Sequence, residues 1–514
     1  MNASEDPAND STVRAEAAHD ADQLARLGYA QELDRRMSGF SNLAISLSII
    51  CVLAGGLTSF HLGFNSVGGA AIGIGWPVAC LLSLAVAAAM AQLASAFPTA
   101  GGLYHWAAIL GGRGWGWMTA WYNLVGLVTV LAAINVGAYE FLIRSLFPES
   151  TPGLGMQWTV VGVMTASQAW LNHEGIRLTT RLTDFSGYWI LTVSAILTAA
   201  LLWSSPHYDF HRLLAFSNFS GLPSESPVWA RHNSIGWLFA LGLLLPAYTI
   251  TGFDASAHVA EETLGADHEV PRGIVRSVLL SGLAGWILLS AIVLAIPDLG
   301  EAAGQGSGVF FWTLRARFSE PVVKALCAAI FVAQYLCGLA TVTSASRMTY
   351  AFARDGGLPR SEWFHAVHPV HQVPVNAIWA VAIAAFAFTV YSPVYSTITA
   401  VCTICLYISY VLPAAIGIVV YRRGWTQMGP WDLGRWFRPI AAIGVLYCTA
   451  LVVIGVQPPN EKAIVVLATF TVLLIVGWFA GISGRFKGPP QKMLALGHEV
   501  EPVATSEGFI EQEQ

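Results

Sequence analysis

The feature that most constrains this chain is a series of apolar runs, each about as long as a membrane-spanning helix of about 20 residues. Only 11% of the 514 residues are charged, whereas a soluble domain carries about 25%. A water-soluble fold of this composition would lack polar surface, so lipid must cover much of it. We therefore expect an all-α polytopic membrane protein in a lipid bilayer. No basic cluster is dense enough to indicate a nucleic-acid partner.

The apolar runs predict twelve transmembrane helices, of which the third and eighth are long enough to tilt or to project past the bilayer. The expected spans are residues 40–60, 70–95, 116–146, 156–171, 185–203, 235–260, 274–296, 323–352, 375–391, 394–421, 438–455 and 463–482. Residues 39–482 would thus form one twelve-helix domain. Residues 1–38 are polar and acidic and predict a disordered tail, and residues 483–514 form a second tail.

Lysine and arginine gather in the segments that share one side when the spans alternate across a membrane. Most of the 26 basic residues fall in these segments, including Arg35, Arg36 and Arg422. The positive-inside rule therefore predicts that both termini are cytoplasmic, and Arg485 and Lys487 agree with this orientation. We expect the host to be the plasma membrane. The residues do not indicate an oligomeric state.

Two spans, five helices apart, are interrupted. The first carries A-G-G-L at residues 54–57, and the sixth carries T-G-F-D-A at residues 251–255. In membrane proteins built from inverted repeats, small ligands bind at the midplane between two broken helices, where freed backbone groups contact them. An alternative interpretation is that the two glycines of the first span only allow close helix packing. The candidate substrate-binding residues are Ala54, Gly55, Gly56, Leu57, Phe253, Asp254, Ala255 and Ser256.

Asp254 lies inside an apolar helix, where a charge costs at least about 2.5–3.5 kcal/mol. Four roles are open to it: binding an ammonium group, carrying a proton, orienting the unwound backbone, or accepting hydrogen bonds from the amides that begin the second half-helix. At the break in the first span, free N–H groups favour a carboxylate. A ligand with an ammonium at one end and a carboxylate at the other is therefore expected between the two breaks.

Candidates for gating or ion coupling lie on several spans. Glu261 and Glu262 follow the sixth span and predict either a gate or proton route, or a solvated helix end paired with Arg272 or Arg276. Hydroxyl groups of the eighth span predict either a sodium site with helix 1 carbonyls or bonds within their own helix. The full set is Tyr122, Tyr248, Glu261, Glu262, Thr341 and Ser344. A proton or sodium is the expected coupling ion. No residue spacing indicates a metal site, a site for another cofactor or a catalytic triad, so we expect that the protein is not an enzyme.

Three stretches carry a resemblance to a known superfamily. They read S-A-F-P-T-A-G-G-L-Y-H-W at residues 95–106, T-G-F-D-A-S-A-H-V-A-E-E-T at 251–263 with P-R-G-I at 271–274, and S-R-M-T-Y-A-F-A-R-D-G-G-L-P at 346–359. Together they resemble the amino acid–polyamine–organocation superfamily, and within it the amino acid/choline branch. On physical grounds alone, residues 95–106 predict either a buried re-entrant gate or an ordinary turn.

The resemblance implies a five-plus-five inverted repeat with broken helices 1 and 6, followed by two C-terminal helices. It implies a secondary transporter of a small amino acid or related amine such as GABA, and we expect proton symport by alternating access. Choline, polyamines and basic amino acids are alternative substrates, exchange is an alternative mode, and a nutrient sensor is an alternative class. Some relatives carry a proton on a lysine of helix 5, which this chain lacks, since Arg177 and Arg181 precede its expected fifth span.

Overall fold

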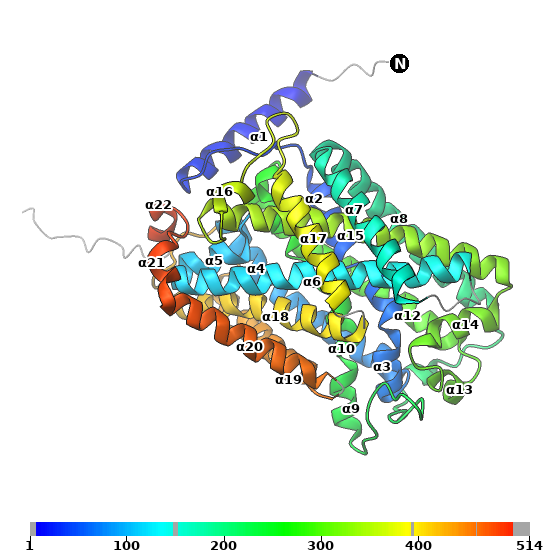
Figure 1. The fold of residues 1–514 in the computed structure, drawn as a ribbon. Coiled ribbons are helices and arrows are strands. Elements are labelled where there is room, and N and C mark those ends of the chain that lie inside the picture. Colours follow the sequence, from blue (N-terminus) through cyan, green and yellow to red (C-terminus); the bar gives the residue numbers. More distant parts are fainter. Residues whose placement is uncertain (1–6, 148–152, 392–394, 459, 497–514) are drawn as a thin grey trace, which may run out of the picture.

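The computed structural model describes residues 7–147, 153–391, 395–458 and 460–496, and within these ranges the chain is helical and forms no strand (Figure 1). Each of the twelve expected spans has a helical counterpart there. In chain order they are α2 (Gly39–Ile49), η1 (Val52–Gly56) and α3 (Phe60–Val67); η2 (Ala71–Gly75) and α4 (Trp76–Ala96); α6 (Arg113–Leu146); α7 (Leu154–His173); α8 (Ile176–Ser204); α9 (Ile235–Gly242), α10 (Leu244–Thr249) and α11 (Ala255–His258); α12 (Ala266–Ala295); α15 (Glu320–Arg354); α17 (Val375–Tyr391); α18 (Tyr395–Val420); α19 (Phe437–Gly455); and α20 (Glu461–Gly477) with η7 (Trp478–Ile482).

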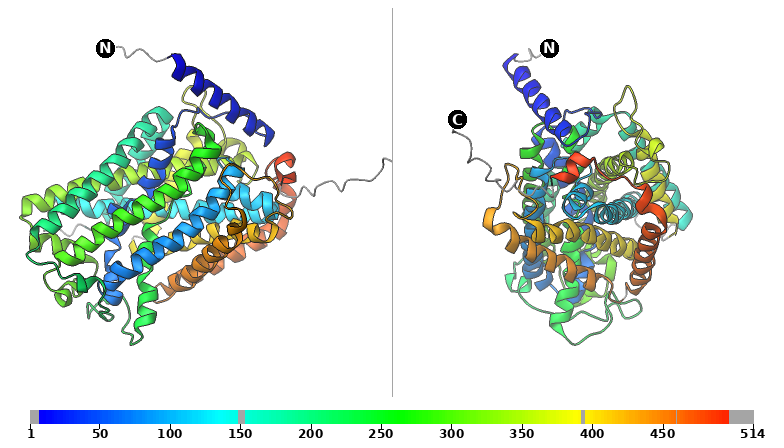
Figure 2. Two further views of the ribbon diagram at one scale, coloured as in Figure 1. Left: turned by 180° about the vertical axis from the view of Figure 1, so that it is seen from behind. Right: turned by 90° about the vertical axis from the view of Figure 1, so that its left-hand side faces the viewer.

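Further helices lie before, between and after the spans. They are α1 (Pro7–Arg26), α5 (Leu103–Gly111), η3 (Phe210–Leu213), η4 (Ala260–Glu262), α13 (Leu299–Ala303), η5 (Gly306–Gly308), α14 (Val309–Arg317), α16 (Ser361–Phe364), η6 (Gly434–Trp436), α21 (Ser483–Arg485) and α22 (Gln491–Ala495). Figures 1 and 2 show α1, α21 and α22 at one end of the bundle and α13 and α14 at the other.

The third and eighth spans are long, as expected, with 34 residues in α6 and 35 in α15. Three expected boundaries are wrong. The first span continues through α3 to Val67 rather than ending at residue 60. The seventh helix begins at Ala266, because its first turns are polar and add little to an apolar run. The fifth helix begins at Ile176, so Arg177 and Arg181 lie inside α8, with exposed side chains, rather than before it.

The two halves of the bundle pack in corresponding ways. The third helix of each half, α6 and α15, pack against each other along the centre of the bundle. The last helix of each half packs on the long helix of the other half, α8 on α15 and α18 on α6. The broken helices meet, since α10 contacts η1 and α11 contacts α2. This is the expected five-plus-five arrangement, and α19 and α20 lie outside it.

The N-terminal segment differs from the disordered tail expected for residues 1–38. Pro7–Arg26 form α1, and Asp20 and Leu24 near its end are buried. The carboxylate of Asp20 accepts hydrogen bonds from the amides of Gly265 and Ala266, at 2.9 and 3.3 Å. These bonds satisfy free N–H groups at the start of α12 and hold the tail against the bundle. Residues 1–6 and 497–514 lie outside the described residues.

Candidate functional site

Helix 1 is interrupted at its centre. α2 ends at Ile49, the backbone of Cys51 leaves the helical region with φ −18° and ψ 101°, and a π-helical turn follows over Val52–Gly56. The break therefore begins a few residues before the predicted glycines. Gly55 has a packing role, because a Cβ there would lie 2.9 Å from Cα of Thr249 on helix 6. Both interpretations of the glycine pair hold: the helix is broken, and a glycine lets the two broken helices touch.

Helix 6 is interrupted between the end of α10 at Thr249 and the start of α11 at Ala255. Gly252 has a φ of 85°, in the left-handed region that glycine adopts without steric cost. The freed backbone groups of this break are bound by side chains. The amide of Gly252 donates to the Tyr410 hydroxyl at 3.1 Å, and the Ser46 hydroxyl donates to the carbonyl of Phe253 at 3.0 Å. The protein itself therefore satisfies part of this break.

Asp254 is fully buried, and protein donors surround its carboxylate. The Tyr410 hydroxyl donates to one oxygen at 2.8 Å, and the side-chain amide of Asn123 donates to the other at 3.0 Å. Nε2 of His258 lies 3.3 Å from that second oxygen. This arrangement joins helices 3, 6 and 10 at the break. The carboxylate does not cap the start of α11, so the predicted role as acceptor for the amides of the second half-helix is wrong, and its printed partners are side chains.

Ala255 and Ser256 begin α11 and are also buried. The Ser256 hydroxyl lies 2.7 Å from that of Ser46, and the side-chain amide of Asn42 donates to the Ser256 carbonyl at 3.0 Å. These bonds lock the inner half-helices of helices 1 and 6 together. Residues 253–256 thus lie in a closed part of the molecule.

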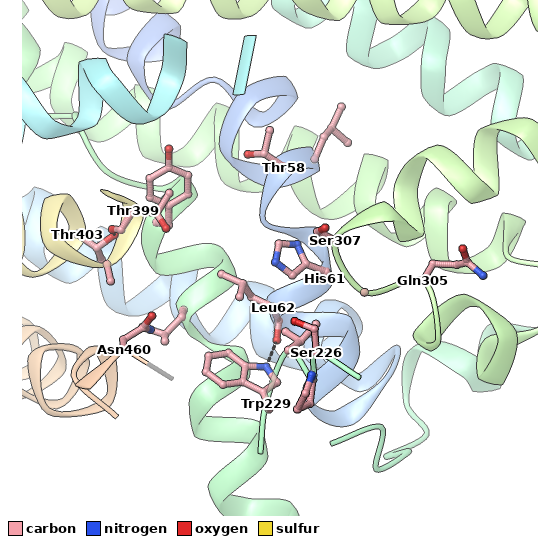
Figure 3. A pocket seen from close by; sticks show the side chains of 18 of the residues that line it. Thr58, His61, Leu62, Ser226, Trp229, Gln305, Ser307, Thr399, Thr403 and Asn460 are labelled. Carbon is pink, nitrogen blue, oxygen red and sulfur yellow. Dashed lines mark hydrogen bonds between the residues drawn. The ribbon is translucent and has the colours of Figure 1, made fainter. Parts of the chain in front are cut away.

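A cavity of about 500 Å³ lies on the other side of the two breaks (Figure 3). Of the predicted substrate and gating residues, Leu57 and Tyr248 line it. Segments near α13 and α14 form its rim, at the end of the bundle opposite α1, α21 and α22. Trp229 belongs to this rim and donates its indole N–H to the carbonyl of Leu62 at 2.7 Å, which fixes the rim to helix 1 (Figure 3). A small solute can therefore approach the breaks from one end.

Two titratable side chains of the cavity wall were missed in the sequence. Glu140 of α6 and His61 of α3 both line the cavity. Glu140 lies in an apolar span and could have been found by the argument that singled out Asp254. His61 gave no comparable signal, because a single histidine in an apolar helix is commonly a packed core residue.

Beyond the breaks, on the side away from the cavity, buried ion pairs hold the end of helix 6 closed. Both guanidinium–carboxylate bonds between Arg347 and Glu262 are 2.8 Å long, and neither side chain is exposed. Arg354 binds Glu261 in the same two-pronged way, at 2.8 and 2.9 Å. The sequence-based pairing with Arg272 or Arg276 is therefore wrong. The long helix α15 reaches the end of helix 6 and supplies the partners, whereas Arg272 pairs with Glu269.

Neighbouring donors and charges lower the pKa of two carboxyl groups in this closure, those of Glu261 and Asp355. Burial raises the pKa of Glu261, but the positive charge and hydrogen bonds of Arg354 outweigh burial and hold this pKa below its ordinary value of 4.5. Burial likewise raises the pKa of Asp355, whereas a hydrogen bond from His105 helps to bring that pKa below 3.8. Tyr29 and Tyr104 also donate to Asp355, both at 2.8 Å.

The segment of residues 95–106 takes part in this closure. Leu103–Gly111 form α5, whose first eight residues are buried, so this stretch is more than an ordinary surface turn. The amide of Ala100 donates to Glu261 at 3.1 Å, and the N-terminal segment adds the amides of Arg36 and Met37, which donate to the carbonyl of Glu262. Four segments distant in sequence thus meet at the end of helix 6.

Three further candidates lie away from the cavity. The Tyr122 hydroxyl is bonded to Thr471 of α20. Thr341 donates to the carbonyl of Cys337 in its own helix at 2.8 Å, and Ser344 is buried without a hydrogen-bond partner among the described residues. On the same helix, Gln334 donates its side-chain amide to the freed carbonyl of Leu53 at 3.0 Å.

Comparison with known proteins points in one direction. The family model described as "Amino acid permease" matches residues 37–480. The chain is 31% identical to "Amino-acid permease BAT1" of Arabidopsis thaliana, over 92% of this chain and 96% of that protein. It is 31% identical to "Amino-acid permease BAT1 homolog" of Oryza sativa subsp. japonica, over 91% and 95% of the two chains. A third relative is "Uncharacterized amino-acid permease C74.04" of Schizosaccharomyces pombe, at 28% identity over 92% and 87%.

Proposed function

This chain belongs to the amino acid permease family, and from that premise we propose that it transports a small amino acid or related amine such as GABA together with protons, by alternating access. The family consists of membrane transporters, so the protein is a multi-pass permease and no enzyme. The observation that carries the proposal is the one-sided cavity. It reaches the two broken helices from one end, while buried ion pairs close the other end.

One-sided access is what a carrier requires. If both ends were open together, the solute would leak through as in a channel, and accumulation would be impossible. The closure consists of discrete groups on α15, η4 and the N-terminal segment, and these can separate as a unit. In the orientation that the basic residues predict, the cavity faces outside and the ion pairs face the cytoplasm.

The choice of the proton over sodium is supported by the cavity wall, where Glu140 and His61 are titratable. The oxygens near the break in helix 1 do not separate the two ions. The Leu53 carbonyl accepts a hydrogen bond from Gln334 and the Thr341 hydroxyl donates one, and both oxygens keep lone pairs. The missing helix 5 lysine means that any proton carrier here lies elsewhere.

Uptake into proteoliposomes tests the proposal. Labelled GABA, choline, putrescine, lysine and alanine would each be offered under an inward proton gradient, an inward sodium gradient, or with unlabelled solute inside. We expect one of the amino acids to accumulate, and the proton gradient to stimulate it. Stimulation by sodium or by internal solute alone would replace symport by another coupling mode. Tight binding of one solute without uptake of any would indicate a sensor.

A further inference from the structure

We propose that the outer cavity contains a waiting site for the substrate, in which Glu140 binds the ammonium group and His61 binds the carboxylate. This inference rests on the proposed function and adds the recognition chemistry of the entry path. The waiting site lies before the breaks in helices 1 and 6, since Leu57 and Tyr248 line the same cavity. Its ligand is a zwitterionic or cationic amine.

Glu140 is the one carboxylate among the described residues that line the cavity. It forms no ion pair with any other residue that the structure describes, although Arg144 follows one helical turn later. The guanidinium of Arg144 lies 4.0 Å from the centre of the Phe311 ring instead. A carboxylate in a membrane span usually faces a cavity or a partner. Glu140 is exposed at the cavity, and the nearest opposite charge that acts on it is Arg144. An ammonium group bound in the cavity would give Glu140 a direct ion-pair partner.

Phe311 also lines the cavity, and Arg144 already occupies one face of its ring. A cation bound to the ring would therefore face an existing positive charge nearby. The carboxylate of Glu140 is thus the better binding partner for an ammonium group in this part of the cavity.

His61 supplies the second contact. Its side chain is only 9% exposed and points into the cavity in Figure 3, while its Nδ1 atom is shielded from the cavity. The ring nitrogen that a ligand in the cavity can reach is therefore Nε2. A substrate carboxylate would accept a hydrogen bond from the imidazole. Because His61 and Glu140 come from different helices, α3 and α6, movement of helix 1 would change the spacing of the two contacts.

Four variants test the proposal, after wild-type uptake has identified a transported amino acid. Glu140→Gln removes the charge and keeps the shape, and Glu301→Gln is the matched control, since Glu301 lies on the same end of the protein but not in the cavity. His61→Ala removes the second contact. We expect Glu140→Gln to raise KM about 10-fold to 100-fold, as for loss of a hydrogen bond between charged groups, and Glu301→Gln to leave KM unchanged.

Inhibition by half-ligands provides a readout that misfolding cannot imitate. External butylamine has only the ammonium group, and external butyrate has only the carboxylate. In the wild type both should inhibit uptake; Glu140→Gln should relieve inhibition by butylamine alone, and His61→Ala should relieve inhibition by butyrate alone. His61→Gln, which keeps a donor, should restore inhibition by butyrate.

The outcomes separate this inference from the proposed function. If the wild type transports none of the offered solutes, the proposed function fails. If it transports an amino acid but butylamine does not inhibit, or Glu140→Gln behaves like Glu301→Gln, the waiting site is refuted and the transport function stands. If each variant lost inhibition by butylamine and inhibition by butyrate to the same extent, the assigned roles would also be refuted.

Discussion

The ion pair between Arg347 and Glu262 offers the sharpest perturbation of the closure at the end of helix 6. Replacing Glu262 by Gln leaves a buried guanidinium without its counter-charge. Breaking a buried pair in this way costs about 3–5 kcal/mol in the closed state. In the open state the same group meets water, so most of this cost shifts the equilibrium between the states. At about 1.4 kcal/mol per factor of ten, we expect opening to become favoured by two to three orders of magnitude.

Amide hydrogen exchange of residues 255–263 measures this opening directly, because their protection depends on the closed state. The matched control is Glu269→Gln, which breaks the pair with Arg272, whose side chain is 45% exposed. A surface pair contributes about 0–1 kcal/mol, so the control should change exchange little. A double variant with Arg347→Met should recover part of the loss, because it removes the stranded charge. Equal exchange in Glu262→Gln and Glu269→Gln would refute the reasoning.

Three further predictions follow from the breaks and their closure. The folded-state pKa of Glu261 is below 4.5, so its stabilising contribution is complete above pH 4.5 and is lost as the pH falls through the lower folded value. After correction for the intrinsic pH dependence of exchange, the exchange rates of residues 255–263 should be constant above pH 4.5 and rise as the pH falls below it. Asp254→Asn places an amide against surrounding donors, so both uptake and thermal stability should fall, the latter by about 1–3 kcal/mol; unchanged uptake would remove its assigned role. Gly252→Ala places alanine in the left-handed region with its Cβ against Ile49, so it should lower the free energy of unfolding by more than about 1 kcal/mol and reduce uptake. Gly155→Ala adds its Cβ in open space and should change neither stability nor uptake.

Apolar periodicity and spacing predicted the helices well, because a bilayer imposes the same length on every span. The breaks were found to within a helical turn, since Gly55 and Gly252 mark positions where a side chain does not fit. Helix boundaries with polar first turns were missed, as at Ala266, because amphipathic turns outside the lipid do not differ from loops in composition.

The pairing of charges was the weakest inference from sequence. Arg272 is close to Glu262 along the chain, whereas Arg347 is distant and is brought there only by the packing of α15 against helix 6. The same limit applies to Asp254, whose partners Asn123 and Tyr410 come from helices 3 and 10. Tertiary contacts of this kind have no local signal.

The most direct test of the central claim is the sidedness of the cavity. Thr58 lines it, and a Thr58→Cys variant can be labelled with a membrane-impermeant maleimide in sealed vesicles of either orientation, against the wild type with its native cysteines. We predict labelling only from the side opposite the termini. The transported amino acid should slow this labelling, and the Glu262→Gln substitution should reduce it. Labelling from both sides at once, or labelling that the amino acid does not affect, would contradict the account.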